Sequence, residues 1–292
     1  LCLLTPFAFW SCREDFSEED YPSYLYVTPF SFSVSDPEKE GSASADISYG
    51  WVYVNNQFYG AFELPAEIPV LAQGPSDIRI FPGVRYNASN VTPQVNPFYL
   101  SHRETRTLTG QQTDTIQPAS TYNESCFFAF REDFEGGQSF RQDIDGLDVS
   151  HMNITTDPEL ALEGRSGFIE VDEDAPYKRV FADEIFPGGG GLGIPENGNP
   201  LLIELDYRGD VDLHVGIQGY DSEGFPLPNT FLVLRPSETW KKAYFDASPT
   251  VERVGQLANF YRIYLAASGT SQGQATARAY VDNVKLVYFQ EQ

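Results

Sequence analysis

Apolar and polar residues alternate along the first part of the chain in short runs separated by turn residues. Residues 24–27 and 30–34 each place their apolar side chains on one face, and the same two-residue period returns at 47–54 and 57–62. Asn55 and Asn56 separate the last two runs, and asparagine tolerates the positive φ that a tight hairpin needs. The pattern therefore predicts paired β-strands in this part of the chain.

The second part of the chain repeats this pattern from Cys126 onward. About eight strands with turn residues between them are typical of a jelly-roll sandwich. The clearest of these predicted strands are 166–171, 201–207, 211–218, 230–234, 242–245, 260–266 and 277–289.

The length and composition agree with two β-domains. A chain of 292 residues exceeds the usual size of one domain, and 14% aromatic residues with 24 Gly and 20 Pro favour strands joined by turns over long helices. We therefore expect an all-β protein with two β-sandwich domains, the second a jelly roll. The first domain and a linker are expected over residues 24–120, and the second domain over 121–292.

The net charge of −23 limits the possible partners. Forty-two acidic residues against 19 basic ones repel the phosphates of nucleic acids, so we expect no nucleic-acid partner. The same charge disfavours adsorption to anionic lipid, so a link to a membrane is expected to be a covalent or inserted anchor.

The first 23 residues have the pattern of a processing signal. Residues 1–11 are mostly apolar but too few to span a bilayer, Cys12 follows Ser11, and residues 12–23 form an acidic tether. This arrangement resembles a bacterial lipobox, and the acidic tract resembles the export signal of Bacteroidetes surface lipoproteins. The resemblance implies a lipid anchor on Cys12 in the outer membrane, facing the cell surface or, alternatively, the periplasm. The other interpretation is the remnant of an ordinary cleaved signal peptide.

Two further resemblances concern the folds. The stretch 51–60, followed by Leu64-Pro65 and by residues 78–83, resembles PEGA-like β-sandwich modules. Residues 133–136, 240–246, 261–265 and 279–287 resemble galactose-binding jelly rolls, a fold that many carbohydrate-binding modules share. The second resemblance implies a carbohydrate partner for the second domain.

The same jelly-roll resemblance implies a structural calcium ion. Its expected ligands are Asp133, Glu135 and Asp282, because calcium prefers several oxygen ligands. The alternative is that the three carboxylates are ordinary turn or edge residues.

Sugar recognition requires an exposed aromatic face beside hydrogen-bonding groups. Four aromatic residues near predicted loops or strand ends are the candidates, with a core position as the alternative for the last: Tyr177, Tyr220, Phe225 and Trp240. His214 falls inside a predicted strand and is expected to be a strand residue with a satisfied ring. Thr115 lies in a triplet, Asp114-Thr115-Ile116, that resembles a Bacteroidetes O-glycosylation site.

Catalysis has one candidate pair. Glu204 and Asp206 alternate on one face of a predicted strand and resemble part of the catalytic set of sandwich glycoside hydrolases. The further Glu that those enzymes need is missing, since Arg208-Gly209-Asp210 follows. We therefore expect a non-catalytic, lipid-anchored envelope protein that binds carbohydrate. A structural component that binds other envelope proteins and a glycan-active enzyme are the two alternatives.

Overall fold

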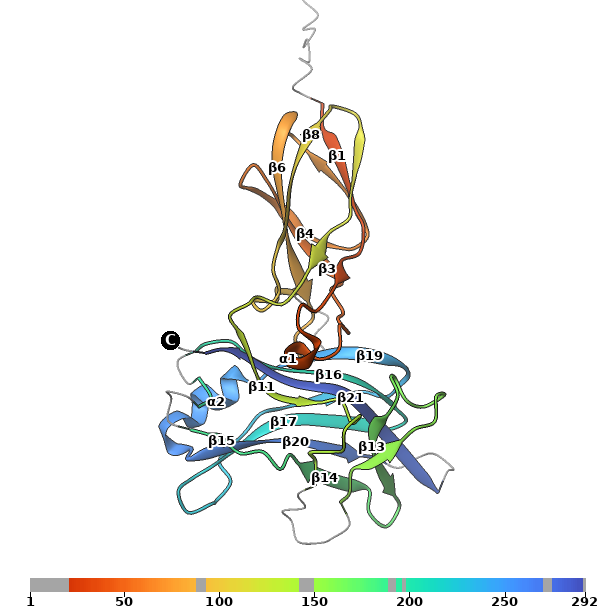
Figure 1. Cartoon of the computed structure of the whole chain (residues 1–292), viewed down its shortest axis with the longest axis vertical. Helices are drawn as coiled ribbons and strands as arrows, with labels where there is room; N and C mark the ends of the chain where they lie inside the picture. Colours follow the sequence, from red (N-terminus) through yellow and green to blue (C-terminus); the bar gives the residue numbers. More distant parts are fainter. Residues whose placement is uncertain are drawn as a thin grey trace, which may run out of the picture.

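The computed structural model describes residues 21–87, 93–141, 150–188, 193–195, 198–269 and 275–290. Within these residues the chain is almost entirely β-structure and forms two sandwiches stacked along the long axis of the molecule (Figure 1). The prediction of an all-β protein with two β-sandwich domains is confirmed. The described part of the chain contains no helix that is long and apolar enough to cross a membrane.

The first domain packs a three-stranded sheet, β5-β1-β9, against a sheet in which β4-β3-β6-β7 are neighbours and β8 also pairs with β6. Asn55 and Asn56 make the expected hairpin turn with φ of 51° and 65°. Between the two sheets lies an aliphatic core that includes Leu25, Val52 and Ile80. The elements of this domain are β1 (Ser23–Val27), β2 (Ser31–Phe32), α1 (Pro37–Glu40), β3 (Tyr49–Val54), β4 (Gln57–Glu63), β5 (Ala66–Val70), β6 (Gly74–Val84), β7 (Gln94–Val95), β8 (His102–Leu108), β9 (Thr113–Ile116) and β10 (Ala119–Ser120).

The second domain is a larger two-sheet sandwich. One sheet has the order β12-β13-β21-β16-β19, with β11 also paired to β21, and the other has the order β14-β20-β17-β18, with β15 paired to β20. Its elements are β11 (Cys126–Glu132), β12 (Asn153–Thr155), β13 (Ser166–Asp172), β14 (Tyr177–Phe181), β15 (Phe186–Pro187), β16 (Leu201–Gly209), β17 (Asp212–Tyr220), β18 (Phe231–Leu234), β19 (Ser237–Asp246), α2 (Ser248–Val254), η2 (Gly255–Leu257), β20 (Phe260–Ser268) and β21 (Thr276–Phe289).

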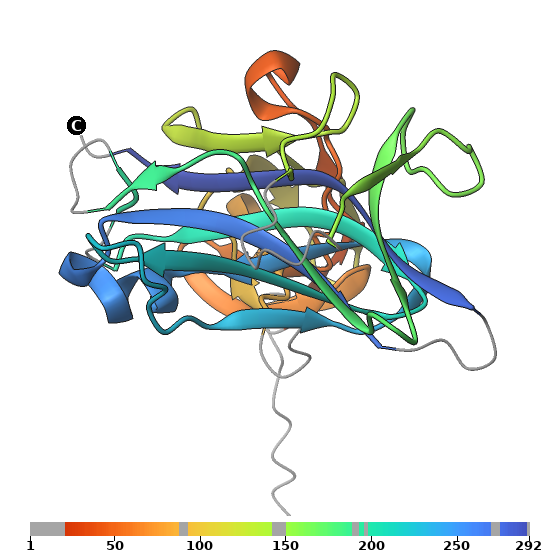
Figure 2. The same ribbon diagram turned by 90° about the horizontal axis from the view of Figure 1, so that it is seen from below.

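The two sheets of the second domain have different surroundings. The sheet that contains β16, β19 and β21 lies against the first domain, and the sheet of β14, β17, β18 and β20 forms the opposite side of the sandwich (Figure 1). In the view from below, the strands of the second domain lie in front of the first domain (Figure 2). The outer face of the β14-β20-β17-β18 sheet is therefore turned away from the first domain.

A third hydrophobic core, here called the junction core, joins the two domains. Tyr86, Phe98 and Tyr122 of the first domain pack in it with Tyr244 and Val287 of the second domain. A backbone hydrogen bond also crosses the junction, since the N–H of Asn87 donates to the carbonyl of Tyr244 at 2.8 Å. The full set of buried residues in the junction core is Ile47, Val84, Tyr86, Phe98, Tyr99, Tyr122, Cys126, Leu202, Tyr244 and Val287.

Candidate functional site

The outer face of the β14-β20-β17-β18 sheet results from strict alternation along each strand. In β17, Leu213, Val215 and Ile217 point into the sandwich core, so His214 and Gly216 between them point outward. The same alternation turns every second side chain of the neighbouring strands to this face. The face can therefore present a row of side chains from four strands side by side.

Three rings form an aromatic strip on this face, namely Tyr177 of β14, His214 of β17 and Phe231 of β18. Tyr177 is 47% exposed and Phe231 is 50% exposed. The His214 ring meets the Tyr177 ring edge-on, with centroids 6.0 Å apart, and stacks on the Phe231 ring at 5.4 Å. Exposed rings held in one row provide apolar faces against which the C–H surface of a sugar can pack.

Hydrogen-bonding groups surround the aromatic strip. Nε2 of His214 lies 2.7 Å from Oγ of Ser268, which confirms the expectation of a satisfied strand histidine. Burial lowers the pKa of His214, so the ring is neutral near neutral pH. Asp212 accepts a hydrogen bond of 2.6 Å from Nη1 of Arg235 at the same end of the sheet. Polar groups of both kinds, donors and acceptors, thus flank the exposed rings.

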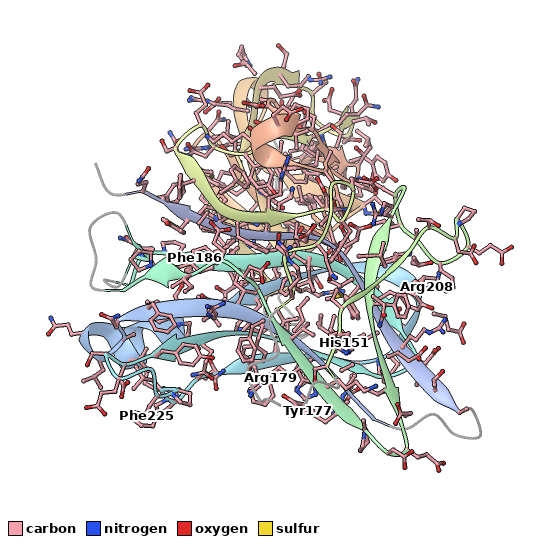
Figure 3. The ribbon with its side chains drawn as sticks, turned by 60° about the horizontal axis from the view of Figure 1, so that its bottom comes forward. His151, Tyr177, Arg179, Phe186, Arg208 and Phe225 are labelled. Atoms are coloured by element: carbon pink, nitrogen blue, oxygen red, sulfur yellow. The ribbon has the colours of Figure 1, made fainter. Side chains whose placement is uncertain are left out.

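Tyr264, a buried residue that is 4% exposed, lies beside the aromatic strip with its ring over Gly216. A Cβ atom at Gly216 would come within 2.5 Å of the Tyr264 ring, so only glycine leaves room for it. The Tyr264 hydroxyl accepts a hydrogen bond of 3.0 Å from Nδ2 of Asn229, and the Arg179 guanidinium lies 5.7 Å from the ring centroid. Within the described part of the chain, Nε of Arg179 is buried and has no hydrogen-bond partner. Arg179 and Tyr177 lie close together on the side of the sandwich remote from the first domain (Figure 3).

The structure separates the four aromatic residues that the sequence suggests for sugar binding. Tyr177 lies on the aromatic strip, and Phe225 is 62% exposed on the loop between β17 and β18, farther along the same sandwich (Figure 3). Tyr220 is only 6% exposed, because its ring stacks on Phe260 at 4.9 Å, so it offers no free face. Trp240 belongs to β19 of the other sheet and is half-buried at the domain junction. Of the four, Tyr177 alone belongs to the strip.

The candidate catalytic pair, Glu204 and Asp206, is buried at the domain junction. Glu204 accepts hydrogen bonds from the hydroxyls of Tyr122 at 2.7 Å and Tyr99 at 3.4 Å. Asp206 accepts hydrogen bonds from Oγ of Ser44 at 2.6 Å and from Nδ2 of Asn283 at 3.1 Å. Because these bonds occupy the two carboxylates and the first domain covers them, they have the environment of structural groups.

The three carboxylates expected to bind calcium line one small pocket of about 130 Å³. Asp133, Glu135 and Asp282 lie there with Glu163 and with Arg131. Oδ2 of Asp282 accepts a hydrogen bond from Ser166 at 2.6 Å, and Oε1 of Glu135 accepts one from the N–H of Arg165 at 2.7 Å. Across the described ranges, no three Asp, Glu, His or Cys side chains are arranged to hold a metal ion. The carboxylates are thus neighbours but do not form a ligand set as they stand.

The remaining predicted positions have simple surroundings. Thr115 is exposed in β9 of the first domain, where a modification would be accessible. Cys12 lies outside the described residues. Cys126 is a free, buried thiol, and burial raises its pKa to about 12. It is therefore an unreactive core residue.

Phe231, Arg179 and Ser268 of the candidate site were not identified from the sequence. The alternation of apolar and polar residues within 230–234 predicts a strand, but it does not show which neighbouring strands share the outer face of that strand. Arg179 and Tyr177 lie in β14, a strand that the sequence pattern did not reveal. The signal that could have found Phe231 is an aromatic residue on the outward side of a predicted strand.

Comparison with known proteins gives structural neighbours but no family. No protein-family model matches the chain, and no curated protein matches it. A family 11 carbohydrate-binding module from Clostridium thermocellum, solved with a β-1,3-1,4-mixed-linked tetrasaccharide, aligns over 55% of this chain and 95% of its own, with 15% identity and a TM-score of 0.37. A family 30 carbohydrate-binding module aligns over 59% of this chain and 87% of its own, with 8% identity and a TM-score of 0.36.

A third neighbour belongs to a much larger protein. The enzymatically active domain of tailspike protein 4 of bacteriophage CBA120 aligns over 56% of this chain and 19% of its own, with 11% identity and a TM-score of 0.33. At these TM-scores the function has to be inferred from the side chains of this chain.

Proposed function

We propose that this protein binds carbohydrate through the outer face of the β14-β20-β17-β18 sheet. The observation that carries the proposal is the aromatic strip, in which two half-exposed rings, Tyr177 and Phe231, are held in line by His214. Exposed aromatic rings with donors and acceptors beside them are what a sugar ring requires, since its axial C–H groups pack on a ring face while its hydroxyls form hydrogen bonds.

The protein is proposed to bind its ligand without catalysis. The one carboxylate pair that resembles a glycosidase set, Glu204 and Asp206, has exposed fractions of 0% and 3%. A retaining or inverting glycosidase needs two carboxyl groups that reach the scissile bond from either side of a cleft. Carboxylates enclosed beneath the first domain cannot approach a polysaccharide there.

The lipid anchor belongs to the same proposal. It rests on the resemblance of the segment that ends at Cys12 to a lipobox, and it places the protein at the outer membrane, on the cell surface or on the periplasmic side. The first described residues lie at the tip of the first domain, at the end of the molecule opposite the second domain (Figure 1). A chain anchored in this way would hold the aromatic strip on the side remote from the lipid.

A glycan-array screen of the whole chain tests the binding proposal. The whole chain is needed because the second domain alone would expose the junction core, including Leu202, Tyr244 and Val287. The expected result is saturable binding to one class of glycan. Binding to that class should be about tenfold weaker in Phe231→Ala and unchanged in Leu71→Ala, a change at an exposed side chain of the first domain. Absence of binding to every glycan on the array would contradict the proposal.

A second candidate function, contact with another envelope protein, is favoured by a different surface. On the outer face of the first domain, Phe58 is 48% exposed and stacks on Trp51 at 5.7 Å. Tyr53 packs against both Phe58 and Phe81, at 5.0 and 5.5 Å. Aromatic residues are enriched in protein interfaces. Cross-linking in intact cells that depends on Phe58 but not on Phe231 would support this second function.

A further inference from the structure

A cavity lies between the two domains. This junction cleft has a volume of about 540 Å³ and is lined by Arg85 and Asn87 of the first domain and by Arg235, Lys241 and Lys242 of the second. Ligand sites usually have volumes of about 300 to 1,000 Å³ and often lie at domain interfaces. The junction cleft therefore has the size and the position of a small-molecule site, separate from the aromatic strip.

The charge of the junction cleft is opposite to that of the molecule. Four basic side chains line it, Arg85, Arg235, Lys241 and Lys242, and Asp46 is the one acidic residue among the lining residues. The chain as a whole has 42 acidic and 19 basic residues. A cleft with low-dielectric walls and one sign of charge concentrates ions of the opposite sign.

Three of these basic side chains keep free donors. Among the described residues, the hydrogen bonds of Arg85 to Tyr49 and Glu63, both at 2.9 Å, come from Nη2 alone, and the bond of Arg235 to Asp212 comes from Nη1 alone. A guanidinium has five N–H groups, so Nε and the other Nη of each arginine remain available. Lys241 is exposed, and none of the described carboxylates forms an ion pair with it. Lys242, by contrast, is held by Asp206 at 3.4 Å.

The walls of the cleft are fixed relative to each other. The N–H of Asp46 donates to the Tyr244 hydroxyl at 2.8 Å, and Oδ1 of Asn87 accepts from the N–H of Asp246 at 3.0 Å. The backbone positions that carry the donors are thus fixed across the two domains before a ligand arrives, which lowers the entropic cost of binding.

We infer that the junction cleft binds a small ligand through an oxyanion group, a carboxylate, sulfate or phosphate, recognised by Arg85, Arg235 and Lys241. Charge-assisted hydrogen bonds from guanidinium and ammonium groups are the strongest that side chains offer to such groups. None of the three rings of the aromatic strip lines this cleft, although the cleft adjoins the sugar-binding sheet at β18, where Val233 and Leu234 belong to its lining.

Isothermal titration calorimetry on the whole chain tests this site. The probes are inorganic sulfate, inorganic phosphate and glucuronate, with glucose as the neutral control. The wild-type protein is expected to bind at least one of the anions at a single saturable site and not glucose. The binding is expected to weaken as sodium chloride is added, because salt screens the attraction. Binding of glucuronate alone would assign the site to an acidic sugar, and binding of all three would assign it to oxyanions in general.

The matched variants are Lys241→Gln/Arg235→Gln and Arg103→Gln. Arg235 and Arg103 are comparable, because each has an exposed side chain paired with one aspartate, Asp212 and Asp77 respectively. The double variant is expected to bind the anion at least about tenfold more weakly. Arg103→Gln, which lies outside the cleft, is expected to bind like wild type. All variants are first checked for an unchanged melting temperature.

Two results would overturn the inference. One is the absence of saturable binding of all three anions to the wild-type protein. The other is equal affinity in wild type and in a double variant that melts at the wild-type temperature. Neither result affects the proposed glycan binding, which is measured separately with a change at Phe231, a residue outside the lining of the cleft.

Discussion

The hydroxyl of Tyr122 donates a hydrogen bond of 2.7 Å to the Glu204 carboxylate across the domain junction, where both side chains are buried. Tyr122 lies just after the last strand of the first domain, and Glu204 lies in β16 of the second. Nζ of Lys285 is 3.2 Å from the same hydroxyl and also donates to the carbonyl of Ser42 at 2.7 Å. A polar network inside the junction core thus connects the two domains.

Removal of this hydroxyl should destabilise the whole protein. In Tyr122→Phe the Glu204 carboxylate loses its shortest donor in a buried place, which we expect to lower the free energy of unfolding by about 1 to 3 kcal/mol. Urea denaturation measures the change. Tyr99→Phe is the matched control with a smaller expected loss, because the Tyr99 hydroxyl lies farther from Glu204, at 3.4 Å. Equal stability of Tyr122→Phe and wild type would contradict the role of this bond.

The Asp282 carboxyl should make stability depend on pH. Burial, which outweighs the hydrogen bonds from Ser166 and from the N–H of Asn283, raises the pKa of Asp282 to about 7. Between its ordinary value of 3.8 and about 7, the folded state holds a proton that the unfolded state has released. The stabilisation from Asp282 is therefore complete below the lower value and disappears as the pH rises through about 7.

Asp282→Asn removes this dependence. We expect the difference in unfolding free energy between about pH 5 and about pH 8 to be smaller in the variant than in wild type, as measured by urea titrations at both values. Burial lowers the pKa of Lys285 to about 7, so this residue also makes stability depend on pH. Both proteins keep Lys285, and the difference between them therefore reports on Asp282. An identical pH dependence of the two proteins would show that Asp282 titrates normally.

Gly216 should be essential to the shape of the aromatic face. The added methyl group of Gly216→Ala would collide with the Tyr264 ring, so we expect a loss of stability of about 1 to 3 kcal/mol and weaker glycan binding. Gly136→Ala is the control, because a Cβ atom there would have no neighbour within 4 Å. Thermal unfolding and glycan titration measure the two effects. A Gly216→Ala protein with wild-type stability and affinity would show that Tyr264 can move without consequence.

Phe231 should contribute measurably to the affinity for the glycan. Loss of one stacking ring in Phe231→Ala is expected to weaken binding about tenfold, which corresponds to about 1.4 kcal/mol. Tyr177→Ala should have a similar effect, while Phe225→Ala tests whether the exposed loop beyond the strip takes part. Titration of the glycan identified on the array into each variant gives the values. Undiminished binding in both Phe231→Ala and Tyr177→Ala would place the site elsewhere.

Calcium can be tested at the pocket of Asp133, Glu135 and Asp282. A bound ion would raise the melting temperature in calcium relative to EDTA, and the rise would be smaller in Asp133→Asn. The four carboxylates around the pocket, including Glu163, repel one another and would be relieved by a cation. The same melting temperature in calcium and in EDTA would contradict the prediction that the resemblance suggests.

The sequence predicted most of the strands but little of the candidate site. In the second domain, alternation and turn residues predicted β16, β17, β18, β20 and β21 close to their observed bounds, because each has buried residues at every second position or is buried throughout. Strand β14 was missed, since Tyr177 and Lys178 are exposed or half-buried and its buried residues are only the last two. Without this strand, the sequence could not show that Tyr177 lies beside His214.

Side-chain roles that depend on contacts between distant residues could not be read from the chain. Glu204 and Asp206 have the spacing of a catalytic pair, and only their burial under Tyr122 and Ser44 shows that they are structural. Likewise, Arg85 and Lys241 are more than 150 residues apart, and the docking of the two domains alone brings them to one cleft.

The junction core has a mechanical consequence for an anchored protein. Any bend between the domains would have to break the hydrogen bond from Tyr122 to Glu204 and expose apolar side chains of the junction core, including Tyr244 and Val287, to water. The two sandwiches should therefore behave as one rigid unit rather than as two domains that move independently. If the proposed anchor holds the tip of the first domain, such a unit would keep a ligand bound to the second domain at a constant distance from the membrane and would transmit force on that ligand directly to the anchor.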